Sequence, residues 1–220
     1  PVQEGLSILD MEPFGFATLL GVDPAGLSGE MATRARITFP LEEEIDPKDV
    51  RFAAAANVRD FAMQRGIGGL PLDKGTLSIS IDANAMDITG NVEVAGVAAN
   101  VAWRQGFYGP DAKSSRLEMT TVLDDAARKK LNMPDVKWLA GPVTVNASLI
   151  AENWQISSGN LTADLSSAAL AVPELLWQKA AGIPAQMDFQ FVLPKDVQET
   201  SQGADQTVKK PLAGSLAFGG

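Results

Sequence analysis

The sequence predicts an all-β protein in which a curled antiparallel meander forms an open groove, with one short α-helix. First, polar and apolar residues alternate almost strictly through residues 74–103, which is the period of strands with one apolar and one solvated face. Second, the same alternation recurs along most of the chain, between turns rich in Gly, Asn and Asp. Third, only residues 124–131 carry clear helix signals. A large sheet with a bare apolar face would aggregate, so we expect it to be curled or folded over.

The first strands are predicted on either side of an acidic loop. Residues 31–39 alternate, with Ala35, Ile37 and Phe39 on one face. Residues 50–60 read as a second strand whose apolar face holds Val50, Phe52, Ala54, Ala56 and Val58. Upstream, residues 14–20 fit a short helix or a strand, and residues 40–47 between the two strands are predicted as a solvated loop.

The clearest ladder follows, and it supplies the candidate site. Leu77, Ile79 and Ile81 point one way, while Thr76, Ser78 and Ser80 point the other. Breaks are expected at residues 82–84, Gly90 and Gly96, where turns, bulges or close backbone approaches are tolerated. The residues predicted to line an apolar groove are Leu77, Ile79, Ile81, Val92 and Val94.

The second half continues as strands after the helix. Residues 116–123 alternate, and the helix over 124–131 begins with acidic and ends with basic residues, with Pro134 beyond it. The remaining strands are predicted at residues 141–150, 154–158, 161–165, 168–172 and 185–193, with a turn at 158–160. Residues 196–210 are polar and predict a loop or linker, and residues 212–218 begin a further strand.

We interpret residues 1–220 as a single β-groove module. Strands at this short spacing indicate one antiparallel meander rather than two folding units. The chain starts at Pro1, without an initiator Met or a signal peptide, so we expect it to be a fragment of a longer protein.

Composition excludes several classes of function. The formal net charge of −9 disfavours nucleic acid as a partner, because binding to phosphates requires a basic surface. The chain has no Cys and no His, which removes thiolate metal sites, disulfides and the usual general base. No run of about 18 apolar residues predicts a transmembrane helix.

The remaining chemical candidates have simpler structural explanations. Asp124 and Asp125 could hold a metal or act as acids, but carboxylates at a helix N-terminus are favoured as caps. Asp164 is the polar-face residue of an alternating strand, and Gly66–Gly69 precedes a strand, so it predicts a turn rather than a dinucleotide loop. No catalytic residue, metal site or cofactor is therefore predicted, and we expect the protein not to be an enzyme.

One long segment resembles a known family. Residues 164–185 are similar to the pattern DL..A.L..P...W.K..G.PA of AsmA-like proteins, specifically their YhdP-like branch in Gram-negative bacteria. Shorter pieces resemble the same family in the same order: Phe39-Pro40-Leu41 with Asp49-Val50, then Gly75-Thr76-Leu77, Met86–Gly90 and Val101–Trp103, then Leu139–Val143. The resemblance covers roughly residues 20–195.

The resemblance implies a function. Members of this family are envelope proteins that are anchored in the inner membrane and project through the periplasm, where a β groove is thought to carry phospholipid. It implies that this chain is a segment of such a lipid-transfer bridge. Its partners would be phospholipid acyl chains, neighbouring β modules of the same chain, and the membrane through segments outside this fragment.

Two alternatives stay open, because an apolar strand face can meet lipid or a second sheet. In the second case the chain would be a non-catalytic β-sandwich module that serves as a spacer or in adhesion. A glycan-active enzyme is disfavoured, since it would need two carboxylates in a cleft flanked by aromatic platforms, and the chain has only four Trp and one Tyr.

Overall fold

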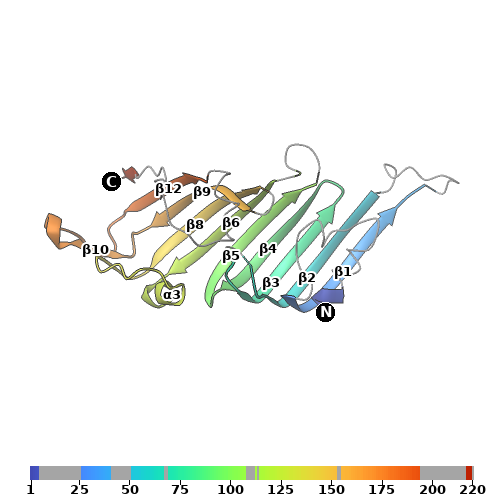
Figure 1. Ribbon diagram of the computed structural model, residues 1–220, viewed down its shortest axis with the longest axis horizontal. Helices are drawn as coiled ribbons and strands as arrows, with labels where there is room; N and C mark the ends of the chain where they lie inside the picture. The colour runs from blue at the N-terminus through green and yellow to red at the C-terminus, as the bar shows by residue number, and fades with distance from the viewer. Residues whose placement is uncertain are drawn as a thin grey trace, which may run out of the picture. The chain divides into compact units, whose positions relative to one another are not determined.

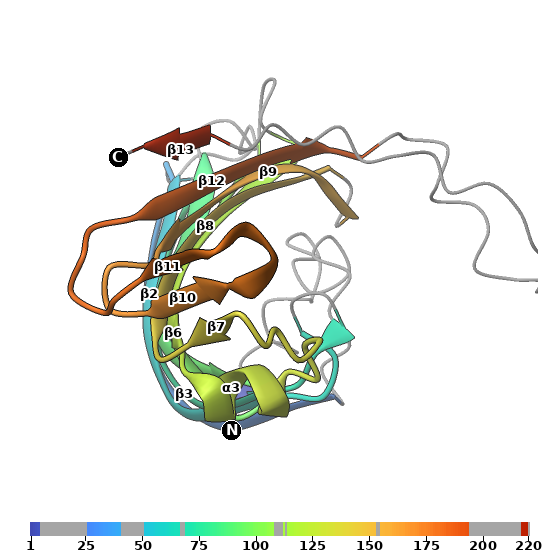
Figure 2. The same cartoon turned by 90° about the vertical axis from the view of Figure 1, so that its left-hand side faces the viewer.

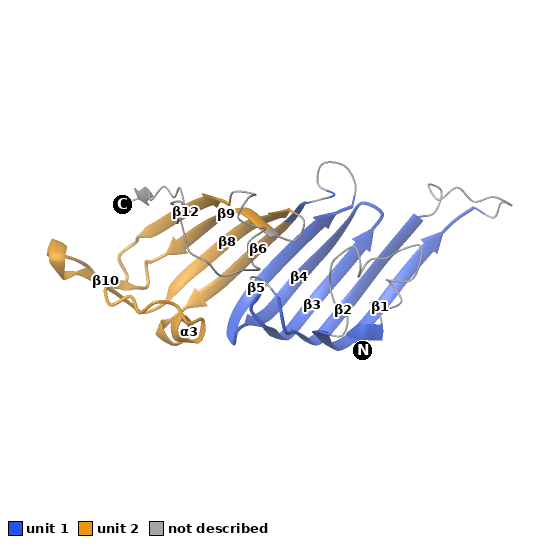
Figure 3. Cartoon of the chain, in the orientation of Figure 1, with its two compact units in different colours: residues 1–115 blue, residues 116–220 orange. Residues whose placement is uncertain are grey.

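The computed structural model is mostly antiparallel β, with short helices, and confirms the predicted fold class. The chain divides into two compact units, residues 1–115 and residues 116–220 (Figure 3). The predictions for residues 14–20, for 41–47 of the loop, for 196–210 and for most of 212–218 lie outside the described residues. The structure describes residues 1–4, 26–40, 51–66, 69–107, 112, 114–152, 155–193 and 217–219.

Unit 1 is an antiparallel meander in which each strand pairs with the next along the chain (Figure 1). The predicted faces are confirmed: Leu77 and Ile81 are buried, while Ser78 and Ser80 are exposed. The strands are β1 (Leu27–Thr38), β2 (Arg51–Met63), β3 (Leu72–Asp82), β4 (Ala85–Val94) and β5 (Val97–Gly106).

Two of the predicted breaks are hairpin turns. Between β3 and β4, a carboxylate oxygen of Asp82 accepts hydrogen bonds from the backbone N–H groups of Asn84 (2.7 Å) and Ala85 (3.0 Å). These donors hold the pKa of Asp82 below its usual value, because they stabilise the ionised carboxylate. Between β4 and β5, Ala95 and Gly96 both have positive φ (48° and 79°), as a tight two-residue hairpin turn requires.

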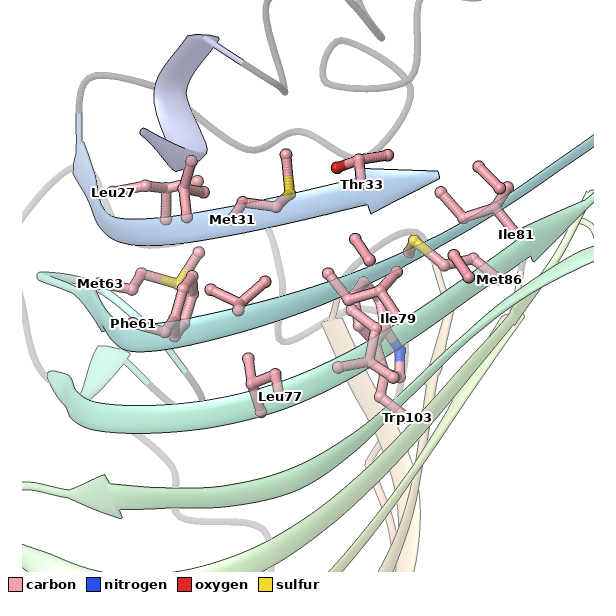
Figure 4. A pocket seen from close by; sticks show the side chains of 16 residues that line it. Leu27, Met31, Thr33, Phe61, Met63, Leu77, Ile79, Ile81, Met86 and Trp103 are labelled. Carbon is pink, nitrogen blue, oxygen red and sulfur yellow. The ribbon is translucent and has the colours of Figure 1, made fainter. Parts of the chain in front are cut away.

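At Gly90 the strand continues, and the close approach of two backbones, one of the expectations for this position, is confirmed. Gly90 lies inside β4 with φ of 152° and pairs with Leu77, next to a register shift in β3 between Asp73 and Thr76. A Cβ atom at Gly90 would lie 2.1 Å from the carbonyl oxygen of Thr76, so no side chain fits there. Register shifts of this kind bend a strand, and the strands in Figure 4 are visibly curved.

Unit 2 contains a second set of neighbouring strands. The helix α3 (Asp125–Lys130) lies between β6 and the rest. The predicted turn at residues 158–160 is wrong, because Gly159 lies inside one continuous strand and pairs with Leu149 and Phe191 on the two neighbouring strands. In sheet order the strands are β6 (Ser114–Leu123), β8 (Val143–Glu152), β9 (Gln155–Asp164), β12 (Gln186–Val192) and β13 (Ala217–Gly219).

The helix is capped as predicted. Asp124 is its N-cap, and its carboxylate accepts a hydrogen bond from the Ala127 backbone N–H at 2.7 Å. The buried Arg128 pairs with Asp125 and donates to the carbonyl oxygens of Leu123 (2.7 Å) and Gly141 (2.9 Å). The acidic pair at residues 124–125 therefore has a structural role in holding the helix to the chain around it.

A small second sheet, which the sequence did not predict, covers part of unit 2 (Figure 2). Its strands are β11 (Trp177–Lys179), β10 (Ala169–Val172) and β7 (Leu139–Ala140), in that order, and the short 3-10 helix η5 (Pro173–Leu175) joins β10 to β11. Leu170 of the small sheet packs in one cluster with Val143 of β8 and Ala163 of β9. Where the small sheet lies, the apolar strand face of this unit is therefore covered by the chain's own residues.

Candidate functional site

Apolar side chains of unit 1 surround a hollow of about 130 Å³ on one face of the meander (Figure 4). All five strands of this unit contribute. The lining residues are Val2, Leu27, Met31, Thr33, Ala54, Ala55, Ala56, Val58, Phe61, Met63, Leu77, Ile79, Ile81, Met86, Ile88 and Trp103.

The strand register builds this lining in rows. One row runs across every strand of the unit, because Thr33 pairs with Ala56, Ala56 with Ile79, Ile79 with Ile88, and Ile88 with Trp103. Directly opposed residues in antiparallel strands point to the same face, so these five side chains share one surface. The alternation that predicted the strands therefore also places the lining.

Small residues leave the space. Ala54 and Ala56 lie on β2 and border the hollow, and Ala56 pairs with the larger Ile79 on β3. A methyl group fills less space than a Leu or Ile side chain, so these two positions help to keep the hollow open.

One end of the hollow meets the start of the chain. Val2, on the helical turn of residues 2–4, is buried and belongs to the lining. Gln3 fixes this turn, because its side-chain amide donates to the carbonyl oxygen of Leu27 at 2.7 Å. No pattern in the sequence predicted this contact.

The chemistry of the lining is that of a hydrocarbon-binding surface. Among the described residues that line the hollow, none is ionisable, and only Thr33 and Trp103 carry a polar side-chain atom. Such a surface offers dispersion contacts and removal of apolar area from water, and it has no group that transfers a proton or holds a metal. Elsewhere in the described part of the chain, no cluster of three or more Asp or Glu could hold a metal ion.

The five predicted groove residues divide into two groups. Leu77, Ile79 and Ile81 line the hollow. Val92 and Val94 lie further along the same face of β4, but they are only 4% and 7% exposed and do not border the hollow. Val94 stands between Leu72 and Val97 on the neighbouring strands, so its side chain packs among other branched residues.

Sequence reasoning missed much of the lining. Met31 and Thr33 could have been found, because they precede Ala35 on the predicted face of the first strand. Met86 and Trp103 also follow from alternation once the register is known. Leu27 and Met63 lie at strand ends that the sequence did not mark as strand.

The segment that carries the family resemblance forms the small sheet and its loops. Lys179 is buried, and its ammonium group donates to the carbonyl oxygens of Ala168 (2.7 Å), Ala180 (3.2 Å) and Ile183 (2.9 Å). Gly182 has φ of 89° and donates its N–H to Ser166 at 2.8 Å. These contacts give the segment a structural explanation.

Asp164 begins this segment and caps the turn after β9. Its carboxylate accepts a hydrogen bond from the Ser166 backbone N–H at 2.8 Å. The Ser166 hydroxyl and backbone N–H hold the pKa of Asp164 below its usual value, because both stabilise the ionised form. An ionised, solvent-exposed carboxylate with these partners is a turn residue.

Comparisons with protein-family models, with curated proteins and with solved structures give no match to this chain. Within the described residues, no helix has the length and apolar character needed to cross a bilayer. By its fold and its site, the chain is an all-β protein with an apolar hollow in its first unit.

Proposed function

We propose that this chain is a segment of a periplasmic lipid-transfer bridge, which carries phospholipid between the inner and outer membranes along an apolar β surface. The observation that supports it is the hollow of unit 1, whose lining contains no ionisable side chain among the described residues. The resemblance to the YhdP-like branch of AsmA-like proteins supplies the cargo and the location, as part of an inner-membrane-anchored envelope protein. The neighbouring β modules of the same chain would continue the path.

The size of the hollow suits part of an acyl chain. An apolar cavity of about 150 Å³ accommodates a molecule such as benzene, so about 130 Å³ holds a short hydrocarbon segment. The rest of a lipid chain would extend along the row that contains Ile79 and Ile88. The headgroup would stay in water, because the lining offers it no charged partner.

In this proposal the hollow has no catalytic role. Acyl chains make no hydrogen bonds, so selectivity would come from the width of the hollow, which is bordered by the short side chains of Ala54 and Ala56. A lipid that moves along the surface must also bind weakly at every position. An apolar surface without hydrogen-bonding or charged groups would provide such weak binding.

A structural spacer module is the second candidate, and one observation favours it for unit 2. There the small sheet packs on β8 and β9 through Leu170, Val143 and Ala163. This two-layer packing is what a self-contained β module needs. In unit 1, by contrast, the described strands lie in a single sheet.

The test uses two adjacent residues of β3 that point to opposite faces. Ile79→Arg places a charge in the hollow, and Ser80→Arg places the same charge on the exposed face. Both proteins and the wild type would be purified without detergent and analysed for bound phospholipid by native mass spectrometry and lipid extraction. We expect lipid on the wild type and on Ser80→Arg, and at least a tenfold loss on Ile79→Arg.

Circular dichroism on the same samples provides the control for folding. The long Arg side chain can direct its charge out of an open hollow, so the Ile79→Arg protein should stay folded. Absence of lipid from the wild type, or equal lipid on both variants, would reject the lipid function and leave the spacer.

A further inference from the structure

The turn between β10 and β11 exposes three consecutive apolar side chains. Leu175, Leu176 and Trp177, here called the apolar tip, are 74%, 96% and 49% exposed. In Figure 1 the hairpin that begins with β10 projects away from the other strands of unit 2. Large apolar residues that are adjacent and this exposed on a protrusion indicate an interaction site.

The backbone holds the apex of the tip outward. Leu176 has φ of 49° and ψ of 33°, in the left-handed region, and its N–H donates to the carbonyl oxygen of Pro173 at 3.0 Å. This conformation favours Gly or Asn and is uncommon for a bulky residue. Leu176 adopts this conformation with a side chain that is almost fully exposed, so burial of the side chain does not offset the backbone strain. Strained residues of this kind cluster at functional positions.

Apolar side chains lie on both faces of the small sheet near this hairpin. Trp177 pairs with Val172, which shares the face of the buried Leu170 two residues earlier. Ala171 belongs to the opposite face, and its N–H donates at 2.9 Å to the carbonyl of Trp138, which is itself half exposed. A protein partner meets one side of a hairpin, whereas a bilayer surrounds whatever enters it.

The ionisable residues next to the tip carry both signs. Glu174, directly before Leu175, is exposed, and so is Lys137, the neighbour of the Trp138 that accepts from Ala171. Lys179 is buried and donates to three carbonyl oxygens. The exposed charges balance, so the apolar side chains of the tip would carry its contact with a lipid surface.

We propose that the apolar tip inserts into the interfacial region of a phospholipid bilayer. Leu175 and Leu176 enter the boundary with the acyl chains, and Trp177 lies at the level of the headgroups. This contact does not depend on the hollow of unit 1. An Ile79→Arg protein should therefore bind vesicles as the wild type does.

The test is flotation with phosphatidylcholine vesicles, with and without phosphatidylglycerol. The tip variant carries Leu175→Asn and Leu176→Asn, because Asn tolerates the left-handed backbone and the fold is kept. The control is Val192→Asn, which removes an apolar side chain that is 78% exposed at the end of β12. We expect the wild type and the control to float with both vesicles, and the tip variant to bind at least tenfold more weakly.

A second measurement locates the tip in the bilayer. Brominated acyl chains should quench part of the Trp fluorescence of the vesicle-bound wild type, and Trp177→Phe should abolish that part. The proposal is overturned if the wild type stays in solution, if the tip variant floats like the wild type, or if Trp177→Phe leaves the quenching unchanged.

Discussion

The two units treat the apolar face of their strands differently. In unit 1 the face opens on a hollow between Ala54, Ala56 and the larger residues around them. In unit 2 the equivalent apolar side chains of β8 and β9 meet the small sheet, and Ala168 beside it is completely buried. The same alternating pattern therefore yields either an apolar hollow or a core, and the difference lies in what covers the strand face.

The cover of unit 2 depends on polar contacts as well as apolar ones. Its loops are held by the Lys179 ammonium group on three carbonyl oxygens and by the hydrogen bond from Gly182 to Ser166. In unit 1 the described contact of this kind is at the turn of residues 2–4, where the Gln3 side chain donates to the carbonyl oxygen of Leu27 and Val2 borders the hollow. We infer that the small sheet closes part of the face of unit 2, while the described strands of unit 1 leave a hollow on theirs.

The largest predicted effect on stability comes from placing an Arg in the apolar face of each unit in turn. Ala168→Arg introduces an unpaired charge into a closed core and should destabilise the protein by about 3–5 kcal/mol. Ile79→Arg should cost less than half as much, because its stem can reach solvent through the hollow. Urea denaturation followed by circular dichroism measures both, and equal costs would remove the distinction between the units.

The curvature of unit 1 is tested next. Gly90→Val forces a branched residue into a positive φ and against the Thr76 carbonyl, which should cost about 3 kcal/mol. Gly96→Val at the β4–β5 hairpin turn should cost about 1–2 kcal/mol, and Ser78→Val on the exposed face should cost least. Thermal melts that rank these three variants equally would contradict the strand assignment.

A smaller effect should be confined to unit 2. Lys179→Met keeps the length of the side chain but leaves three carbonyl oxygens without their donor, at a cost of about 1–3 kcal/mol. Peptide-resolved hydrogen exchange should show faster exchange in residues 166–185 and no change in β3. Loss of protection in β3 as well would mean that the two faces are not independent.

The smallest effect concerns the β3–β4 turn and depends on pH. Asp82→Ala removes two hydrogen bonds and should cost about 0.5–1.5 kcal/mol at neutral pH. The pKa of Asp82 is lowered in the folded state, so its contribution exists above the unfolded pKa and is lost as pH falls through the folded one. Melts at pH 7 and pH 2.5 should therefore differ less between variant and wild type at the acidic value. A penalty that stays constant with pH would contradict this role.

Local patterns in the sequence were sufficient for much of the fold. Alternation at Leu77, Ile79 and Ile81 identified β3 and its buried face, and the acidic start of α3 identified Asp124 as its cap. These features depend only on neighbours in the chain, and they can be recognised without knowing the tertiary structure.

Features that depend on distant residues were not predictable. Gly159 suggested a turn, but it lies inside β9. The side chains of its neighbours occupy the space that a larger residue would need, since a Cβ there would come within 2.6 Å of the Leu149 side chain and 2.8 Å of the Phe191 ring. The strands β7 and β11 are two and three residues long, too short for a period to be visible. Val92 and Val94 share the pattern of the hollow residues, and only the register and curvature separate them from it.

The most direct test of the central claim asks where hydrocarbon contacts the chain. Methyl-labelled protein would be titrated with a fatty acid that carries a nitroxide on its chain, and the broadening of each methyl signal would be measured by NMR. We predict strong broadening at Leu77, Ile79 and Ile81, and little at Val143, Leu165 and Leu170 of the closed core. Broadening of the second group as strong as that of the first, or none in either, would contradict the account.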